Sequence, residues 1–202
     1  MRVLKDEKYE SILKAARGEF IRKGYKDASM RAIAAASGVG LSNVYNYFSG
    51  KDGIYAAVVG PARDALFLFI SRQHTEEMVD VNRQVTFGHR EEVIDDYIDI
   101  IERYRDELRL LFFRSEGSSM GGFREALTDH MTRVSYDYMA LEKKRYPATA
   151  DVSHFFIRAL SSWMTGVVAE IVAHEPDRQR IRDFFREYFR FEFAGWRELT
   201  GN

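Results

Sequence analysis

The chain has 202 residues, a formal net charge of −1 and no cysteine. Its hydrophobic fraction of 46% and its mixed charges are typical of a soluble globular protein and exclude a disordered chain. Without cysteine, disulfide bonds, thiolate metal sites and a cysteine nucleophile are excluded. The first residues lack the apolar run of a signal peptide, and continuous apolar stretches such as 66–70 are too short to span a bilayer. We therefore expect a cytoplasmic protein.

Three short helices are predicted in the first quarter of the chain, over residues 5–23, 29–36 and 40–48. Gly24 is expected to end the first helix, with Tyr25 packing back on it, and Ser29 is placed to cap the second. Gly38 breaks the chain between the second and third helices. Two short helices joined by a glycine turn are typical of a helix-turn-helix, whose second helix lies in the DNA major groove. An ordinary helical hairpin is the alternative.

The distribution of charge along the chain favours DNA binding over an ordinary helical hairpin. Residues 1–53 carry ten Lys and Arg against six Asp and Glu, whereas the remainder carries 20 against 25. No acidic residue occurs from Ala28 to Lys51. A basic first domain on an acidic body suits a protein that contacts phosphates at one end only.

Residues 9–58 also resemble a known domain at many positions. The matching residues are Ile12, Ala15, Ala16, Phe20, Gly24, Tyr25, Ile33, Ala34, Gly38, Val39, Val44, Tyr45, Tyr47, Phe48 and Lys51. This pattern resembles the DNA-binding domain of the TetR family of bacterial transcriptional regulators. The resemblance covers a quarter of the chain and implies double-stranded DNA with a palindromic operator as the partner. It also assigns Tyr45 a packing role.

The third helix offers short polar side chains to DNA. Ser42, Asn43 and Asn46 can hydrogen-bond base edges, and Leu41 can contact a thymine methyl group. The resemblance adds phosphate contacts from Tyr47 and Lys51 and backbone contacts from the start of the second helix. Gly40 departs from the family, which usually has Ser or Thr at this cap. The candidate DNA-contacting residues are Ser29, Arg31, Leu41, Ser42, Asn43, Asn46, Tyr47 and Lys51.

The rest of the chain is predicted to be helical as well. Helices are expected over 66–78, 91–104, 105–115, 123–145, 151–174 and 177–199, with a loop in the polar stretch 76–89. The fourth helix should kink or restart at Gly60-Pro61, either as a plain break or as a hinge. We predict an all-α fold of about nine helices, with a DNA-binding domain over 1–50 and an effector-binding and dimerisation domain over 51–202.

The last two helices are the most apolar part of the sequence, and the first of them also carries a row of small residues. Such surfaces indicate a partner subunit, although burial within one large monomeric core is the alternative. The resemblance favours a homodimer formed through these two helices. The candidate interface residues are Phe156, Ser162, Gly166, Ala169, Ala173, Phe185, Tyr188, Phe189 and Trp196.

The resemblance further implies a small-molecule pocket in the helical bundle, with the fourth helix transmitting ligand binding to the DNA-binding domain and ligand releasing repression. Inward-facing aromatic and methionine side chains are candidates, although each position could equally be plain core. The scarcity of buried charge favours an apolar or aromatic effector. The candidate pocket residues are Phe67, Tyr97, Tyr104, Phe112, Phe113, Met131, Tyr136, Met139, Trp163 and Met164.

Two other functions fit parts of the sequence. Glu170 with His174, or Asp129 beside His130, could form a His/carboxylate metal site, but no HExxH or G-x-S-x-G motif is present. We therefore expect no enzyme, no metal and no cofactor. A dimeric DNA-binding protein without an effector is the remaining alternative.

Overall fold

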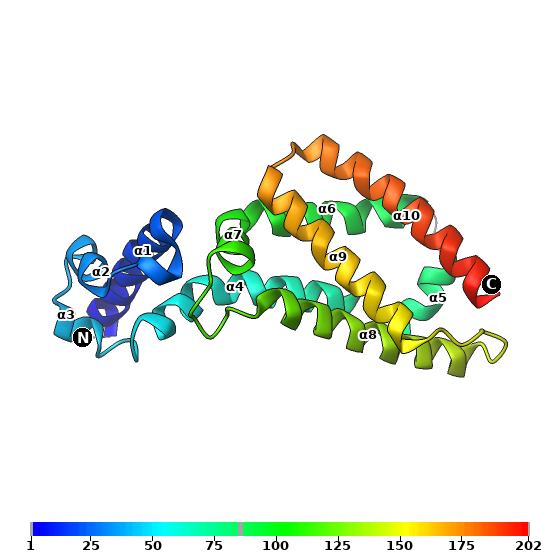
Figure 1. Ribbon diagram of the computed structural model, residues 1–202, viewed down its shortest axis with the longest axis horizontal. Coiled ribbons are helices and arrows are strands. Elements are labelled where there is room, and N and C mark those ends of the chain that lie inside the picture. The colour runs from blue at the N-terminus through cyan, green and yellow to red at the C-terminus, as the bar shows by residue number, and fades with distance from the viewer. Residues whose placement is uncertain (1, 85–86, 202) are drawn as a thin grey trace. The chain divides into compact units, whose positions relative to one another are not determined.

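The computed structural model describes residues 2–84 and 87–201, and within these residues it contains ten α-helices and no strand (Figure 1). The all-α prediction is confirmed, with one helix more than the nine expected. The helices are α1 (Arg2–Asp27), α2 (Met30–Ser37), α3 (Leu41–Val44), α4 (Lys51–Arg72), α5 (Glu76–Gln84), α6 (Phe87–Arg103), α7 (Arg105–Phe113), α8 (Phe123–Arg145), α9 (His154–His174) and α10 (Arg178–Thr200).

The chain forms two compact units. The first unit combines Met1–Asp64 with Tyr104–Phe123, and the second combines Ala65–Arg103 with Arg124–Asn202. The first unit therefore contains α7 and the loop after it as well as the three N-terminal helices. Both units include segments that are distant in sequence, because α4 and α8 each pass from one unit into the other.

A cluster of three rings forms the centre of the first unit. Phe20 is fully buried, and its ring lies 5.0 Å from that of Tyr55 and 6.3 Å from that of Tyr25. Tyr25 reaches this cluster because Gly24 leaves the helical conformation with φ +75°, so the regular helix ends there as predicted. The predicted packing of Tyr25 on the first helix is also confirmed.

The end of α7 closes the same corner of the first unit. The Tyr25 N–H donates to the carbonyl of Arg114 (2.9 Å), and the Arg114 guanidinium donates to the carbonyl of Ile21 (2.7 Å). A Cβ atom on Gly24 would lie 3.3 Å from Arg114, so the close approach and the positive φ both favour glycine here. Arg114 therefore binds the carbonyl groups at the end of α1.

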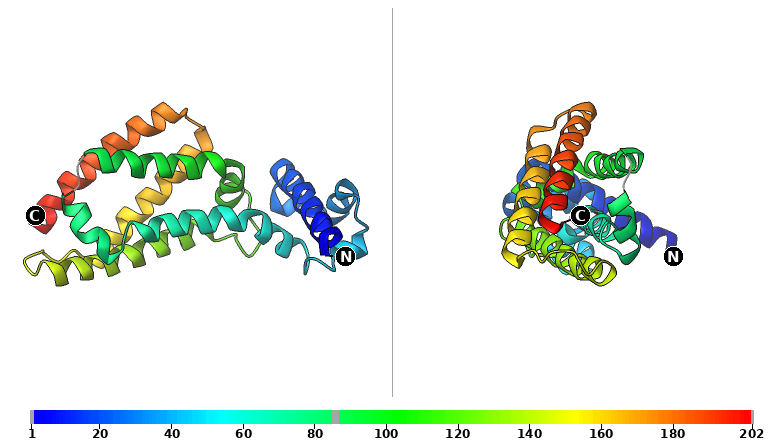
Figure 2. Two further views of the ribbon diagram at one scale, coloured as in Figure 1. Left: turned by 180° about the vertical axis from the view of Figure 1, so that it is seen from behind. Right: turned by 90° about the vertical axis from the view of Figure 1, so that its right-hand side faces the viewer.

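The second unit contains the end of α4 and helices α5, α6, α8, α9 and α10. Helices α9 and α10 run antiparallel, as the two views of Figure 2 show, with Phe156 near Trp196 and Trp163 near Tyr188. Helix α6 lies along α10, where Arg178 pairs with Asp99 (2.7 Å). Helix α8 packs on α4 through ring stacking of His130 on Phe67, with centroids 4.5 Å apart.

Three sequence predictions about helix bounds were wrong. The helix expected over 66–78 is interrupted, because α4 ends at Arg72, residues 73–75 form a turn and Glu76–Gln84 form helix α5, in which Val79 is buried. Helix α4 does not restart at Pro61 but continues to Arg72. Helix α3 ends at Val44, and residues 45–47 form a turn. The expected loop extended to residue 89, and residues 85–86 of it lie outside the described residues.

Helices α4 and α9 are more apolar than the short apolar runs in the sequence suggested. By length and mean hydropathy, both would be able to cross a membrane, although no continuous apolar run in either is long. This is weak evidence, because core helices of soluble proteins have the same character. The side chains Val59, Ala62 and Leu66 of α4 are fully buried within the protein.

Candidate functional site

Helices α2 and α3 form a helix-turn-helix. Ser29 caps α2 as predicted, with its hydroxyl oxygen accepting the Ala32 N–H at 3.4 Å. Gly38 ends α2 in the left-handed conformation at φ +69°, which glycine adopts without steric cost. Ile33 and Val44 are fully buried, and α2 packs on both α1 and α3. The polar side chains of α3 are consequently left on the outside.

The exposed side chains of this motif carry hydrogen-bonding groups and no acid. Ser42 and Asn46 are exposed, and Leu41 and Asn43 are half-buried. The Asn46 side-chain amide donates to the Asn43 amide oxygen at 3.2 Å, so the two side chains hold each other in place. Asn43 keeps its own amide N–H groups for adenine N7, or for another base-edge acceptor.

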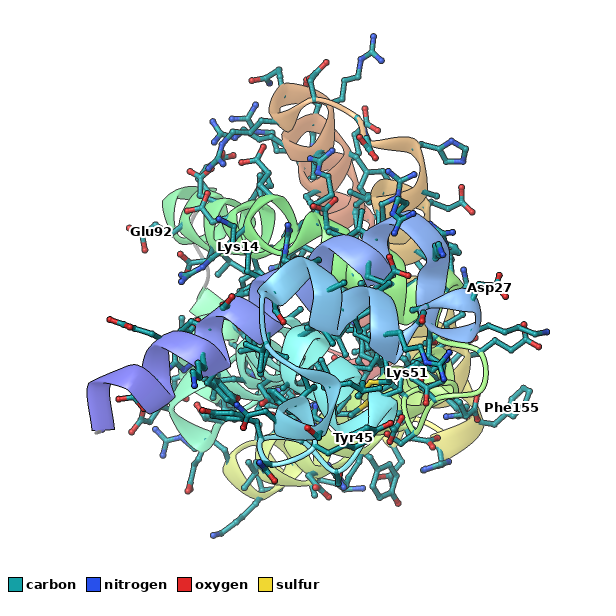
Figure 3. All side chains as sticks on the ribbon, turned by 90° about the vertical axis from the view of Figure 1, so that its left-hand side faces the viewer. Lys14, Asp27, Tyr45, Lys51, Glu92 and Phe155 are labelled. Atoms are coloured by element: carbon teal, nitrogen blue, oxygen red, sulfur yellow. The ribbon has the colours of Figure 1, made fainter. Side chains whose placement is uncertain are left out.

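Three further residues, Arg31, Tyr45 and Tyr47, lie near this polar face. Arg31 is exposed at the start of α2, and Tyr47 is half-buried after α3. Tyr45 is 53% exposed and is labelled in Figure 3, so the packing role inferred for it was wrong. Sequence reasoning therefore missed Tyr45 as a surface residue, because it expected the helix to continue to residue 48, whereas α3 ends at Val44.

Lys51 occupies a different position from the one expected of a free phosphate ligand. Its ammonium donates to the carbonyls of Lys26 (3.1 Å) and Ala28 (3.2 Å) and lies 4.6 Å from the centre of the Tyr25 ring. Figure 3 shows Lys51 within this part of the first unit. Lys51 thus connects the start of α4 to the end of α1, and it has one remaining N–H for a phosphate.

Glu19 fixes the angle between α1 and α2. Its side chain is 4% exposed, accepts the Ser29 backbone N–H at 3.3 Å and pairs with Arg22 and with Lys23 at 3.5 Å. Burial raises the pKa of this carboxyl, but the Ser29 hydrogen bond and the two cations outweigh burial, so the net pKa lies below the ordinary value. The ionised carboxylate therefore stabilises the corner that orients α2 and α3.

This arrangement predicts an acid-sensitive first unit. The pKa of Glu19 is lower in the folded state than in the unfolded state, where it is ~4.3. Glu19 therefore stabilises the fold at pH values above the unfolded-state pKa, and this stabilisation is lost as pH falls through the folded-state pKa. The protection factors of α1 and α2 amides, which are corrected for the intrinsic exchange rate at each pH, should therefore fall more in wild type than in Glu19→Gln as pH drops from about 6 to about 3. Glu10→Gln, at an exposed site on α1, is the matched control. Equal acid sensitivity of wild type and Glu19→Gln would contradict this role.

The second unit contains a cavity of about 790 Å³. Of the ten candidate pocket residues, four line it: Tyr97, Met131, Met139 and Met164. The other six lie elsewhere. Tyr104, Phe112 and Phe113 belong to the first unit, Phe67 stacks on His130, and Tyr136 and Trp163 are exposed. The lining also includes residues that the sequence analysis did not select, among them Phe69, His74, Arg83, Glu142, Phe193 and Glu192.

The candidate dimer residues divide between the core and the surface. Ala169, Phe185 and Tyr188 are buried within the chain itself, and Trp196 and Phe189 line the cavity. Ser162 and Phe156 are exposed, whereas Gly166 and Ala173 are half-buried. The most exposed apolar side chains of α9 and α10 are instead Phe155, which projects outward in Figure 3, Trp163, Phe191 and Leu199.

The residues weighed for an enzyme have structural roles. The Glu170 carboxylate and the His174 Nε2 lie 3.1 Å apart on the exposed surface, and Asp129 pairs with Arg158 at 2.6 Å. His130 receives a hydrogen bond from Ser71 or donates to the Phe67 carbonyl, both at 3.1 Å. In the described part of the chain, no group of three or more His, Asp or Glu side chains is arranged to hold a metal ion.

Comparison with known proteins agrees with this geometry. Residues 12–58 match the family model of bacterial regulatory proteins of the tetR family. FasR of Mycolicibacterium smegmatis, an HTH-type transcriptional activator, is 29% identical over 117 residues, which are 55% of this chain and 48% of FasR. The match thus spans about half the length of that relative.

Solved structures share the fold over nearly the whole chain. NalD of Pseudomonas aeruginosa, the secondary repressor of the MexAB-OprM multidrug efflux pump, gives a TM-score of 0.66 at 18% identity, covering 94% of this chain and 97% of NalD. A TetR-like transcriptional regulator from Rhodococcus sp. RHA1 gives 0.61 at 16% identity, covering 96% and 97%. Residues 12–58, which contain the helix-turn-helix, thus match the DNA-binding domain of the tetR family of bacterial regulatory proteins, and the chain shares the fold of these solved regulators.

Proposed function

We propose that this regulator is a homodimeric repressor that binds a palindromic operator and is released by a small-molecule effector. The observation that carries the proposal is the surface of α2 and α3, where exposed polar side chains lie in a stretch without any acid. Asn43 and Asn46 are hydrogen-bonded to each other at 3.2 Å and are therefore pre-oriented for base edges.

Phosphate contacts come from residues around this surface. Arg31, Tyr45 and Tyr47 carry donors on the same short motif, and Ser29 and Lys51 lie at the helix starts beside it. Such contacts hold the motif in register and carry no sequence information, whereas the amides of α3 read the bases. Since the DNA target lies in the bacterial cytoplasm, the protein acts there.

The dimer is supported by the outer faces of α9 and α10. Trp163 and Phe191 are in ring contact at 6.0 Å and are both exposed, and no atom lies within 4 Å of a Cβ placed on Gly166 or Gly195. The two glycines leave room for a second helix pair to approach closely, and the large apolar side chains beside them supply an apolar surface for it to cover. A two-fold dimer matches a palindromic operator, whose half-sites lie about one helical turn apart.

The effector is supported by the cavity in the second unit. A volume of about 790 Å³ lies within the range of small-molecule sites, and its walls combine aromatic rings with a few polar groups. Repression that ligand releases is the direction we propose; of the similar proteins, NalD is a repressor and FasR is an activator. Ligand need only change the operator affinity by about 1–3 kcal/mol to switch the complex.

The test is selection of bound DNA from a random pool, followed by titration of the selected site. Wild type should enrich a palindrome. Asn43→Ala should lose discrimination at one position of each half-site, about 1–3 kcal/mol, because it removes a base-edge contact. Tyr47→Phe should instead weaken binding to all sequences alike, because it removes one phosphate donor.

The matched control is Asn82→Ala, which removes an amide side chain of the second unit and should leave the DNA-binding profile unchanged. If no sequence is enriched at any salt concentration, the DNA-reading role of α3 is wrong. If an enriched site has no two-fold symmetry, the dimeric operator is wrong. A DNA-binding protein without an effector would bind the palindrome equally at all concentrations of every cavity ligand.

A further inference from the structure

The cavity of the second unit has aromatic walls and several charged groups. Its rings come from three parts of the unit: Phe69 on α4, Tyr97 on α6, and a series on α10. The α10 series consists of Phe185, Tyr188, Phe189, Phe193 and Trp196. The charged residues in the lining are Arg83, Glu142, Arg190, Glu192 and Arg197, and His74 lies there too. The chemistry of the ligand follows from which of these charges already have partners.

Each positively charged side chain in the lining either has a partner within the protein or is exposed to water, and one of the two acids, Glu142, is paired. Arg83 pairs with Glu142 at 3.0 Å, donates to Thr149 at 2.7 Å and lies 3.7 Å from the Tyr146 ring. Arg190 and Arg197 are exposed, so water screens their charges. His74 donates from Nδ1 to the Ile70 carbonyl (2.8 Å) while Ser135 donates to its Nε2 (3.2 Å), which is the neutral form, and burial lowers its pKa.

Glu192 is the exception. Within the described residues it forms no ion pair with Lys, Arg or His. Its hydrogen-bonding neighbours are the neutral groups of Tyr188 and Trp196, one helical turn before and after it on α10. Burial raises the pKa of its carboxyl, and these two hydrogen bonds lower it by less. A carboxylate in aromatic surroundings is costly unless a cation pairs with it.

We propose that the cavity binds an amphipathic cation, with the cationic group against Glu192 and the apolar part between the rings of Tyr97, Phe185 and Phe193. The proposal rests on the effector role given to this cavity and names the chemical class of that effector. It also adds a positive charge to the apolar or aromatic effector expected from the sequence. A carboxylate supplies the counter-charge, and ring faces attract the same cation through their negative potential.

The test compares three probes with one decyl chain and different heads: decyltrimethylammonium, decanol and decanoate, each titrated into the full-length protein by calorimetry below its micelle concentration. The cation should bind about tenfold or more tightly than the alcohol. Glu192→Gln should abolish that preference and leave decanol binding unchanged. Glu198→Gln, an exposed acid on the same helix, is the matched control and should keep it.

A second variant locates the binding. Met164→Trp places a large side chain in the cavity lining and should weaken all three probes. Cation binding that survives Met164→Trp, an unchanged preference in Glu192→Gln, or tighter binding of decanoate than of the cation would each overturn the proposal. Tight decanoate binding would assign the head group to Arg190 or Arg197 instead.

The outcome is separable from that of the operator experiment. Probe binding is measured without DNA, so the cation site can hold even if no operator is enriched. If the cation binds as expected but does not change the affinity for an enriched operator, the regulatory link is wrong and the cation site remains. If neither effect is seen, the effector class proposed here is wrong while the DNA-binding role can still hold.

Discussion

Phe191→Glu is expected to convert the proposed dimer into monomers and to weaken binding to the proposed palindromic operator by about 10²–10⁴-fold. Phe191 is 67% exposed on α10, and its ring lies 6.0 Å from that of Trp163 on α9. A charge at this position would have to be desolvated without a partner in a two-helix-on-two-helix interface, and it would occur twice across the symmetry axis. The folded monomer loses little, because the side chain is mostly in solvent.

The loss arises from avidity and not from the DNA contacts. In the dimer, binding of the first half-site makes the second binding event intramolecular, and a monomer forgoes that gain. Affinity for an isolated half-site should therefore be the same for wild type and Phe191→Glu. Sedimentation velocity measures the oligomeric state, and fluorescence anisotropy measures both DNA affinities.

Tyr136→Glu is the matched control, since it replaces an exposed aromatic residue on α8 by the same acid. The Tyr136→Glu protein should remain a dimer and bind the operator with wild-type affinity. A dimeric Phe191→Glu, or a loss of half-site binding equal to the loss on the palindrome, would contradict the interface proposed on α9 and α10.

The first unit was predictable because its signals are local. A capping serine, two left-handed glycines and the apolar spacing of Ile33 and Val44 each act within a few residues. Helix α5 was missed because it is polar and short, with Val79 as its buried apolar residue, so the period of its apolar residues is too weak to read.

The restart predicted at Pro61 is wrong because tertiary packing outweighs a local rule. A proline inside a helix costs roughly 3 kcal/mol. The side chains of Tyr55, Val59 and Leu66 are fully buried on the same helix, and each contributes about 1.5–3 kcal/mol by leaving water. Packing on both sides of the proline therefore favours one continuous helix over two.

The cavity and the interface were the least predictable parts. Apolar spacing identifies the inward face of a helix but not the element that lies opposite it. Phe112 and Met164 look alike in sequence, yet Phe112 packs on Phe123 with centroids 5.0 Å apart, whereas Met164 lines the cavity. Glu192 was overlooked for a related reason, since the sequence does not show that this acid, on a helix rich in charged residues, is half-buried in the cavity lining.

Phe20→Ala should destabilise the first unit by about 3–5 kcal/mol. Phe20 is fully buried, and its loss would leave a void between Tyr25 and Tyr55, whose rings depend on it for their edge and stacking contacts. Because the chain has two compact units, a single global transition is not assured, so hydrogen exchange of the α1, α2 and α4 amides is the measurement of choice.

The effect on DNA should follow from the folded fraction alone. Once the first unit opens part of the time, the apparent operator dissociation constant rises by the inverse of the fraction that remains folded. Tyr45→Ala, at an exposed position of the same unit, is the stability control and should leave exchange rates near wild type. Exchange rates in Phe20→Ala equal to wild type, together with lost operator binding, would contradict this account, because Phe20 would then act on DNA by some route other than the stability of the motif. If instead exchange accelerates and operator affinity falls in proportion, the ring cluster of Phe20, Tyr25 and Tyr55 is the support on which α2 and α3 depend for reading DNA.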